Sequence, residues 1–237
     1  MGFLKYKYMS KIQWTEKTWN PVIGCDKISG GCKTCYAEKM ASRLAYMKHT
    51  KYYSNVLKTK ENIYSGSEAS CDYDLILKWN GKTYFVESQL TKPSKWKNPK
   101  IIFVCSMGDL FHETVLFEWI DIVHDCIRKA SNHIFIILTK RPERMLDFYK
   151  SKIHFDNIWV GVSVENQEQA DKRIPYLLKC RAKKRFVSLE PMLGEISLEG
   201  DVSTDSKLKP ACPACNCNDL AAALSDNNSL YCEGCEQ

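Results

Sequence analysis

Four nearly continuous apolar runs divide the second half of the chain at regular intervals. They cover residues 101–105, 133–138, 158–162 and 185–189. Such runs are typical of strands that are buried on both faces of a sheet. Between them, apolar residues recur at helical spacing in residues 115–127, 142–149 and 167–179. This alternation predicts an α/β fold with a parallel sheet and right-handed helical crossovers.

The first half of the chain is less regular. Residues 14–24 fit a short first strand, and helix-forming residues extend from Ala37 to about Tyr46. The polar segment 50–99 is interpreted as an insertion into a core unit that spans residues 12–200. Within this insertion, residues 75–86 predict a β-hairpin that turns at Asn80-Gly81, because this dipeptide is a strong short-range turn signal.

A loop with three cysteines follows the first predicted strand. Cys25, Cys32 and Cys35 lie within eleven residues, next to Gly24 and Gly30-Gly31. Three close cysteines without a nearby fourth can hold a metal or a cluster and leave one coordination position open. The glycines allow the backbone to turn tightly around an inorganic group. The simpler alternative is three ordinary reduced cysteines in a turn.

Polar side chains follow each of the four predicted strands. Because the carboxyl ends of parallel strands meet at the same edge of a sheet, these side chains are expected to share a site, as in parallel α/β barrels. Polar residues also end many strands without any function, which is the alternative for any one of these positions. The residues are Ser106, Asp109, Thr139, Lys140, Ser163, Glu165, Ser188 and Glu190.

Residues 207–237 carry a second cysteine cluster. It consists of two Cys-x-x-Cys pairs that are sixteen residues apart. This spacing is typical of a zinc ribbon, in which four thiolates hold Zn²⁺ and the metal stabilises a segment with almost no core. A structural role is expected, with nucleic-acid contact as the alternative. The predicted zinc ligands are Cys212, Cys215, Cys232 and Cys235.

Composition narrows the class of protein. Of the twelve cysteines in 237 residues, seven lie in the two clusters, and no secretion signal precedes them. A reducing cytoplasm and metal binding therefore explain them better than a secreted disulfide scaffold. No apolar run approaches the ~20 residues that span a bilayer. The net charge of +6 permits an anionic partner such as nucleic acid, as do the mixed basic and aromatic residues at 5–8 and 95–97.

Several stretches of the chain resemble known families. The sequence from Cys32 to Ala37, with Cys25 upstream, is similar to the cluster loop of radical S-adenosylmethionine (radical SAM) enzymes. Tyr36, directly after the last cysteine, resembles spore photoproduct lyase and its relatives. A closer resemblance is to a phage-associated three-cysteine family of unknown function, found in phage proteins and prophages. It is carried by residues 19–37, 103–112, 138–142, 159–165 and 186–191.

The resemblance implies a partial (β/α) TIM-like barrel of the radical SAM type, with a [4Fe–4S] cluster on Cys25, Cys32 and Cys35. S-adenosylmethionine would bind the open iron, and an external electron donor would allow its cleavage. The resulting radical would take hydrogen from an unknown substrate, with nucleic acid or a modified base among the options. Position along the chain suggests cofactor contacts from Ser106, Gly108, Asp109, Thr139 and Ser163. It suggests catalytic roles for Lys140, Glu165 and Glu190.

Two features depart from this pattern. Six residues separate Cys25 from Cys32, whereas the usual radical SAM loop reads Cys-x3-Cys-x2-Cys. The chain also ends after the zinc-ribbon segment with five predicted core strands, so that either the product is truncated or the barrel is open. Two alternatives therefore stand beside the enzyme: a zinc-stabilised nucleic-acid-binding phage protein, and an inactive remnant. The sequence leaves the substrate and the oligomeric state open.

Overall fold

A computed structural model describes residues 12, 14–46, 55–59, 77–150, 156–182, 184–198 and 222–223. The four predicted zinc ligands and the basic segment 5–8 lie outside these ranges. None of the helices in the described ranges is long and apolar enough to cross a membrane.

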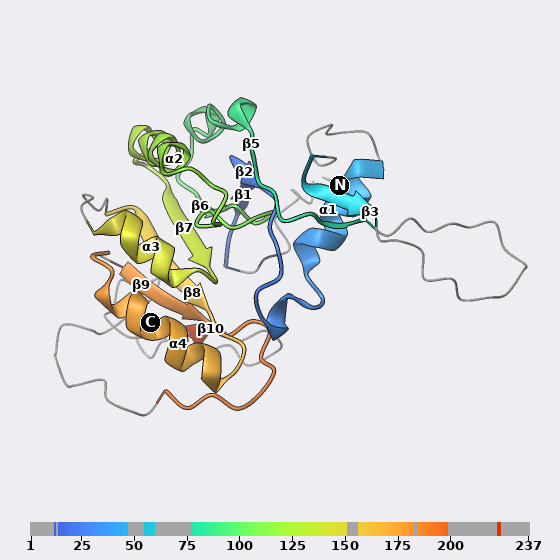
Figure 1. The fold of residues 1–237 in the computed structure, drawn as a ribbon. Coiled ribbons are helices and arrows are strands. Elements are labelled where there is room, and N and C mark those ends of the chain that lie inside the picture. The colour runs from blue at the N-terminus through green and yellow to red at the C-terminus, as the bar shows by residue number, and fades with distance from the viewer. Residues whose placement is uncertain are drawn as a thin grey trace, which may run out of the picture.

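One parallel sheet forms the centre of the protein (Figure 1). The order of its strands in space follows their order in the chain, and a two-residue strand, β10, pairs with the last long one. When crossovers are right-handed, such an order places all connecting helices on one face of the sheet. The strands are β1 (Lys17–Trp19), β6 (Ile101–Val104), β7 (Ile134–Thr139), β8 (Ile158–Ser163), β9 (Lys184–Ser188) and β10 (Ala222–Ala223).

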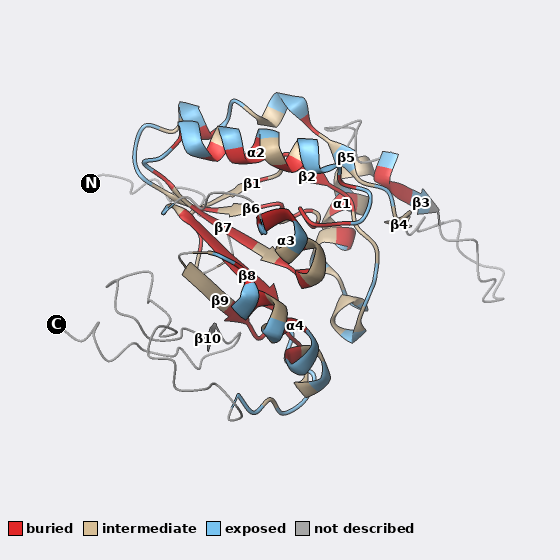
Figure 2. Cartoon of the chain, turned by 60° about the vertical axis from the view of Figure 1, so that its left-hand side comes forward, coloured by how far each residue is buried: buried red, intermediate tan, exposed pale blue. Residues whose placement is uncertain are grey.

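Three helices cover one face of this sheet. In register across β6, β7 and β8, Val104, Ile137 and Val160 are fully or almost fully buried in the main core. Figure 2 shows the buried strands beneath helices whose outer surfaces are exposed. The helices are α2 (Phe117–Lys129), α3 (Pro142–Tyr149) and α4 (Gln167–Lys179). These elements confirm the predicted alternation of strands and helices.

Residues on the opposite face of the sheet are also aligned in rows across neighbouring strands. Leu138, Gly161 and Phe186 are aligned across β7, β8 and β9. A Cβ atom on Gly161 would lie 2.5 Å from the Phe186 ring, so the glycine gives this ring room to lie against β8. Rows of this kind fill the interior of parallel α/β barrels. The edge strands β1 and β10 do not pair with each other in the described residues, so closure of a barrel is not shown.

A small lobe lies beside the main sheet and has its own core. It consists of α1 (Tyr36–Tyr46), β3 (Leu57–Thr59) and β4 (Leu77–Trp79), which pack around buried side chains that include Ala41 and Val56. A second antiparallel pair, β2 (Val22–Ile23) with β5 (Tyr84–Phe85), joins this lobe to the main sheet. Three short 3₁₀ helices complete the description: η1 (Gly30–Cys32), η3 (Glu87–Gln89) and η4 (Pro93–Lys95).

The predicted hairpin over residues 75–86 is wrong in its pairing. The chain does turn at Asn80-Gly81, where Gly81 has a φ of +80°. However, β4 pairs with β3, and β5 pairs with β2. The two flanks belong to different cores, because Trp79 is buried in the small lobe while Phe85 stacks on Trp119 of α2 at 5.2 Å. The Asn80-Gly81 dipeptide predicted where the chain turns but not which strands pair with each other.

Candidate metal centre and its cavity

Two glycines bring the cysteine loop, residues 24–35, to the end of β6. Gly24 has a φ of +91°, and its N–H donates to the Met107 carbonyl at 3.0 Å. A Cβ on Gly24 would lie 2.3 Å from the Lys82 carbonyl oxygen, and a Cβ on Gly108 would lie 2.8 Å from the Gly24 carbonyl oxygen. Both positions therefore need glycine for this close approach. Gly108, predicted as a cofactor contact, thus also serves to place Cys25 beside the sheet.

A cavity of about 370 Å³ opens at the carboxyl ends of the strands. This volume lies within the range of about 300–1,000 Å³ that is usual for small-molecule sites. Cys25, Cys32 and Cys35 all line it, together with the aromatic rings of Trp79 and Phe103. The strand-end residues that line the same cavity are Ser106, Gly108, Asp109, Thr139, Lys140, Ser163 and Glu190.

The three thiols of the loop are free. Within the described residues, their sulfur atoms do not all lie within 4.8 Å of one another. A zinc ion with Zn–S bonds of about 2.3 Å would hold its sulfur ligands closer than that. A cluster of four irons and four sulfides separates its thiolate ligands more widely. The three thiols of the described loop therefore do not form a preassembled zinc site.

Cys25 lies in a buried and charged setting. Burial raises the pKa of its thiol to about 12, and the nearby Asp109 carboxylate acts in the same direction. The Arg141 guanidinium opposes this effect, with Nη1 3.7 Å from the Cys25 sulfur. Cys105 also lines the cavity, but its thiol is buried and hydrogen-bonds to the backbone of Val22. A bound metal would stabilise the Cys25 thiolate, which burial alone disfavours.

Arg141 is the centre of the charged network around the loop, although the sequence analysis assigned it no role. Its guanidinium contacts Asp109 at 3.1 Å and Glu113 at 2.8 Å, and it also pairs with Asp26, the residue after Cys25. Burial alone would lower the pKa of Arg141, but the carboxylates around it hold that pKa above its ordinary value. Arg141 therefore stays charged and connects the loop to the strand ends. Its signal in the sequence was its place two residues after the end of β7.

The predicted cofactor contacts Asp109 and Thr139 are also bonded to each other. The Thr139 hydroxyl donates to the Asp109 carboxylate at 2.7 Å, and the Phe111 and Lys140 N–H groups donate to the same carboxylate. Asp109 is 6% exposed and has most of its acceptor capacity filled. These two residues fix the ends of β6 and β7 relative to each other. Their contact with a cofactor stays a prediction.

Ser106 at the end of β6 is similarly held. Its hydroxyl donates to the Asn20 side-chain oxygen at 3.2 Å, and the Met107 N–H donates to the same atom at 3.0 Å. Asn20 thus caps the turn after β6 and orders the cavity wall, a role that the sequence analysis missed.

Glu165, two residues after the end of β8, connects the cysteine loop to this strand. Its carboxylate accepts a long hydrogen bond of 3.4 Å from the Gly31 N–H, and it pairs with Arg173 at 2.8 Å and with Lys140 at 3.3 Å. Burial acts to raise the pKa of Glu165, but a hydrogen bond from Ser29 and the two cations lower it below its ordinary value. Glu165 is fully buried and does not line the cavity. Its position suits a residue that holds the loop in place.

Lys140 and Glu190 occupy the cavity wall, where catalytic roles were predicted for them. The Lys140 ammonium donates to the Ser163 hydroxyl at 2.8 Å, and this hydroxyl donates to the Glu190 carbonyl at 2.8 Å. Two of the three ammonium donors are used by Ser163 and Glu165, which leaves one for a ligand. Lys140 therefore has a donor with which it can bind an anionic group in the cavity.

Asp26, His112 and Glu113 form a further cluster, with ligand atoms within 4.8 Å of one another. His112 Nε2 lies 3.1 Å from Asp26, and the Arg141 guanidinium pairs with both carboxylates. Burial and the charge of Arg141 lower the pKa of His112, which favours its neutral form. The positive charge of Arg141 already balances these carboxylates, so the cluster is best described as an ion-pair network.

The fold and the site define an α/β protein whose parallel sheet carries a cysteine-lined cavity at the carboxyl ends of its strands. Over residues 9–207 the chain matches the model of a family described as a protein of unknown function (DUF5131), and it belongs to that family. Membership confirms the interpretation of the sequence as that of a family of unknown function. No curated protein and no solved structure matches the chain.

Proposed function

We propose that this protein is an enzyme that binds a [4Fe–4S] cluster through Cys25, Cys32 and Cys35, and S-adenosylmethionine at the iron left without a thiolate. The observation that carries the proposal is that three free thiols from one loop and the polar ends of parallel strands line one cavity.

The proposal includes a partial (β/α) barrel of the radical SAM type. Its support is the strand order, which follows the chain without a reversal, and the placement of α2, α3 and α4 on one face. A doubly wound sheet would reverse its order and carry helices on both faces. The sequential order leaves the other face of the sheet as the interior of an open barrel, with the cavity at its carboxyl end.

When bound, the cluster would supply the electron for cleavage of a sulfonium carbon–sulfur bond, with an external reductant as its source. The residues of this chain would bind and orient the cluster and the cofactor. Arg141 would donate an N–H to the Cys25 thiolate, which lowers the cost of its negative charge. Lys140 would hold the carboxylate of the cofactor with its remaining donor, while Phe103 and Leu138, which line the cavity, would exclude water from it.

Iron and sulfide analysis of protein purified without oxygen tests the proposal. About four irons and four sulfides per chain with a brown chromophore are expected, since the cluster requires them. A Cys32→Ala variant should lose the chromophore. The matched control is Cys126→Ala, because Cys126 lies on α2 and does not line the cavity. The reduced protein should then form 5′-deoxyadenosine from S-adenosylmethionine.

Two results would overturn the proposal. Zinc in place of iron under these conditions would favour the alternative of a zinc-stabilised nucleic-acid-binding phage protein. An intact cluster that never yields 5′-deoxyadenosine would favour an inactive remnant.

A further inference from the structure

The exposed side of α1 carries a line of basic residues that begins at the cysteine loop. Lys33 precedes the helix, and Tyr36, Lys39 and Arg43 follow at helical spacing on its exposed side. Together these four residues are called the α1 stripe. Tyr36 is 63% exposed and also lines the cavity, so the stripe starts at the cavity mouth and extends away from it.

The positive charge of this region is unbalanced. Residues 24–46, 55–59 and 77–86 contain seven basic and only two acidic residues, a large share of the net charge of +6. Both acidic residues are engaged away from the stripe. Asp26 pairs with Arg141, and the buried Glu38 pairs with Lys27 and Lys78. Among the residues of this lobe that the structure describes, no carboxylate pairs with the cations of the α1 stripe.

We propose that the α1 stripe binds the phosphate backbone of a single-stranded nucleic acid and brings one nucleotide to the cavity. Lys39 and Arg43 stand about 6 Å apart along the helix axis, so they can contact separate phosphates. The proposal rests on the proposed function, because it names the substrate class of the same site. A single strand is favoured, since a base within a duplex has to be unpaired and flipped out before it can enter the cavity.

Aromatic side chains around the cavity favour a nucleic acid over an acidic protein. The Tyr36 ring lies at the mouth, and Trp79 and Phe103 line the walls. Flat aromatic faces bind bases by stacking, and their combination with a basic track is typical of single-strand binding. An acidic peptide would use the cations of the stripe but would leave the exposed Tyr36 ring without a stacking partner.

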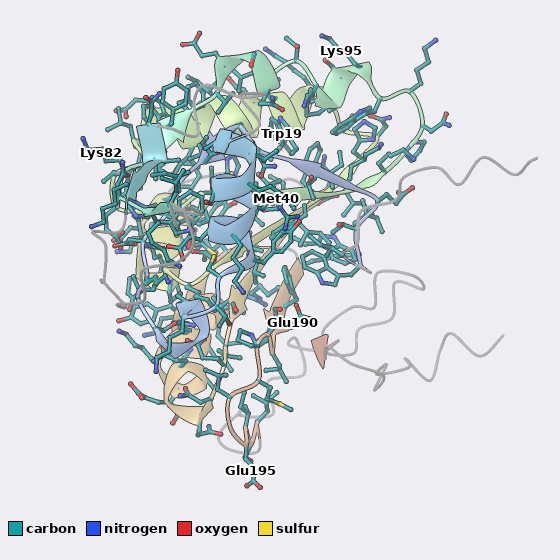
Figure 3. All side chains as sticks on the ribbon, turned by 90° about the vertical axis from the view of Figure 1, so that its right-hand side faces the viewer. Trp19, Met40, Lys82, Lys95, Glu190 and Glu195 are labelled. Atoms are coloured by element: carbon teal, nitrogen blue, oxygen red, sulfur yellow. The ribbon has the colours of Figure 1, made fainter. Side chains whose placement is uncertain are left out.

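A second basic group provides an internal comparison. Lys92, Lys95 and Lys97 are exposed, but they lie near the amino ends of the strands, where the Pro93 carbonyl accepts a hydrogen bond from His133. Figure 3 shows Lys95 far from Glu190 of the cavity. Trp96 between these lysines packs on the main core against His133, so it is not free to stack on a base as segment 95–97 had suggested.

Binding of a fluorescein-labelled, single-stranded 20-mer to the 237-residue chain, followed by anisotropy from low to high salt, tests the proposal. The variant K33Q/K39Q/R43Q should bind at least about tenfold more weakly. Its slope of log affinity against log salt should fall by about 2, because each single-strand phosphate contact contributes about 0.7. The control K92Q/K95Q/K97Q loses the same charge. It should change the affinity and the salt slope much less than the stripe variant does. Tyr36→Ala should weaken binding about tenfold while it keeps the salt slope.

Each contrary outcome overturns the proposal. These are absence of binding, equal loss in both triple variants, tighter binding of a duplex of the same sequence, or equal competition by poly-glutamate, which would indicate an acidic protein partner. Iron content of the same preparations separates the two proposals. The stripe variant keeps all three cysteines and should keep its cluster. Stripe-dependent binding by a protein without iron would leave this inference standing and defeat the proposed function.

Discussion

The Arg141 guanidinium lies 3.7 Å from the Cys25 sulfur, although 116 residues separate the two in the chain. The same guanidinium pairs with Asp109 after β6 and with Glu113 further along that loop. One buried cation thus connects the first candidate ligand to the ends of two neighbouring strands. The position of Cys25 at the cavity depends on this network as well as on the backbone of the loop.

Replacement of Arg141 should destabilise the whole protein. In Arg141→Gln, the Asp109 carboxylate would stay buried without its cation, a loss that costs about 3–5 kcal/mol. Urea denaturation followed by tryptophan fluorescence measures this change. Arg128→Gln is the matched control, since Arg128 forms an exposed pair with Asp125 on α2 and should cost no more than about 1 kcal/mol. Equal losses in the two variants would show that the Arg141 network does not stabilise the fold.

Gly24 and Gly81, the two glycines with positive φ among the residues that the structure describes, should differ in their tolerance of alanine. Gly81→Ala should cost about 1–2 kcal/mol from backbone strain alone, because nothing lies within 4 Å of the added Cβ. Gly24→Ala adds a clash of 2.3 Å with the Lys82 carbonyl oxygen and should cost about 2–5 kcal/mol. The free energies of unfolding from urea titrations test the order. A smaller cost at Gly24 would contradict the close packing of the loop entry.

The sequence predicted the sheet and the shared edge of its polar residues because both follow from local patterns. Continuous apolar runs define buried strands, and parallel strands necessarily bring their ends together. The sequence could not predict side-chain contacts between loops that lie far apart in the chain. Arg141 pairs with Asp26 although 115 positions separate them in the chain, and no sequence pattern predicts that pair. The same limit explains the wrong hairpin, since β4 and β5 found partners in different cores.

Glu38 should make stability depend on acid pH. Burial acts to raise its pKa, but hydrogen bonds from the Trp79 N–H, Lys27 and Lys78 together lower it below the ordinary value of 4.5. A lowered pKa in the folded state contributes stability above pH 4.5, and this contribution is lost as the pH falls below that value. Glu38→Gln should cost about 1.5–3 kcal/mol at pH 7.

The measurement is the free energy of unfolding of wild type and Glu38→Gln between pH 3 and pH 7. The difference between the two proteins should shrink as the pH falls. Glu195→Gln serves as control, because Glu195 is exposed and extends into solvent in Figure 3. A difference for Glu38→Gln that stays constant with pH would show that its carboxylate charge does not stabilise the small lobe.

The two adjacent glycines of the cysteine loop should differ in their effect on the retention of iron by the proposed cluster site. A Cβ on Gly31 would lie 3.1 Å from the Glu165 carboxyl carbon, and Glu165 is held by Arg173 and Lys140 and cannot easily move. Gly31→Ala should therefore displace the loop and increase the rate of iron loss to a chelator about tenfold or more, a change of ~1.4 kcal/mol in barrier. A Cβ on Gly30 would meet only the Leu193 methyl at 3.3 Å, at the end of a flexible side chain that is 55% exposed. Gly30→Ala should consequently release iron at the wild-type rate, and equal release from both variants would mean that Glu165 does not position the loop.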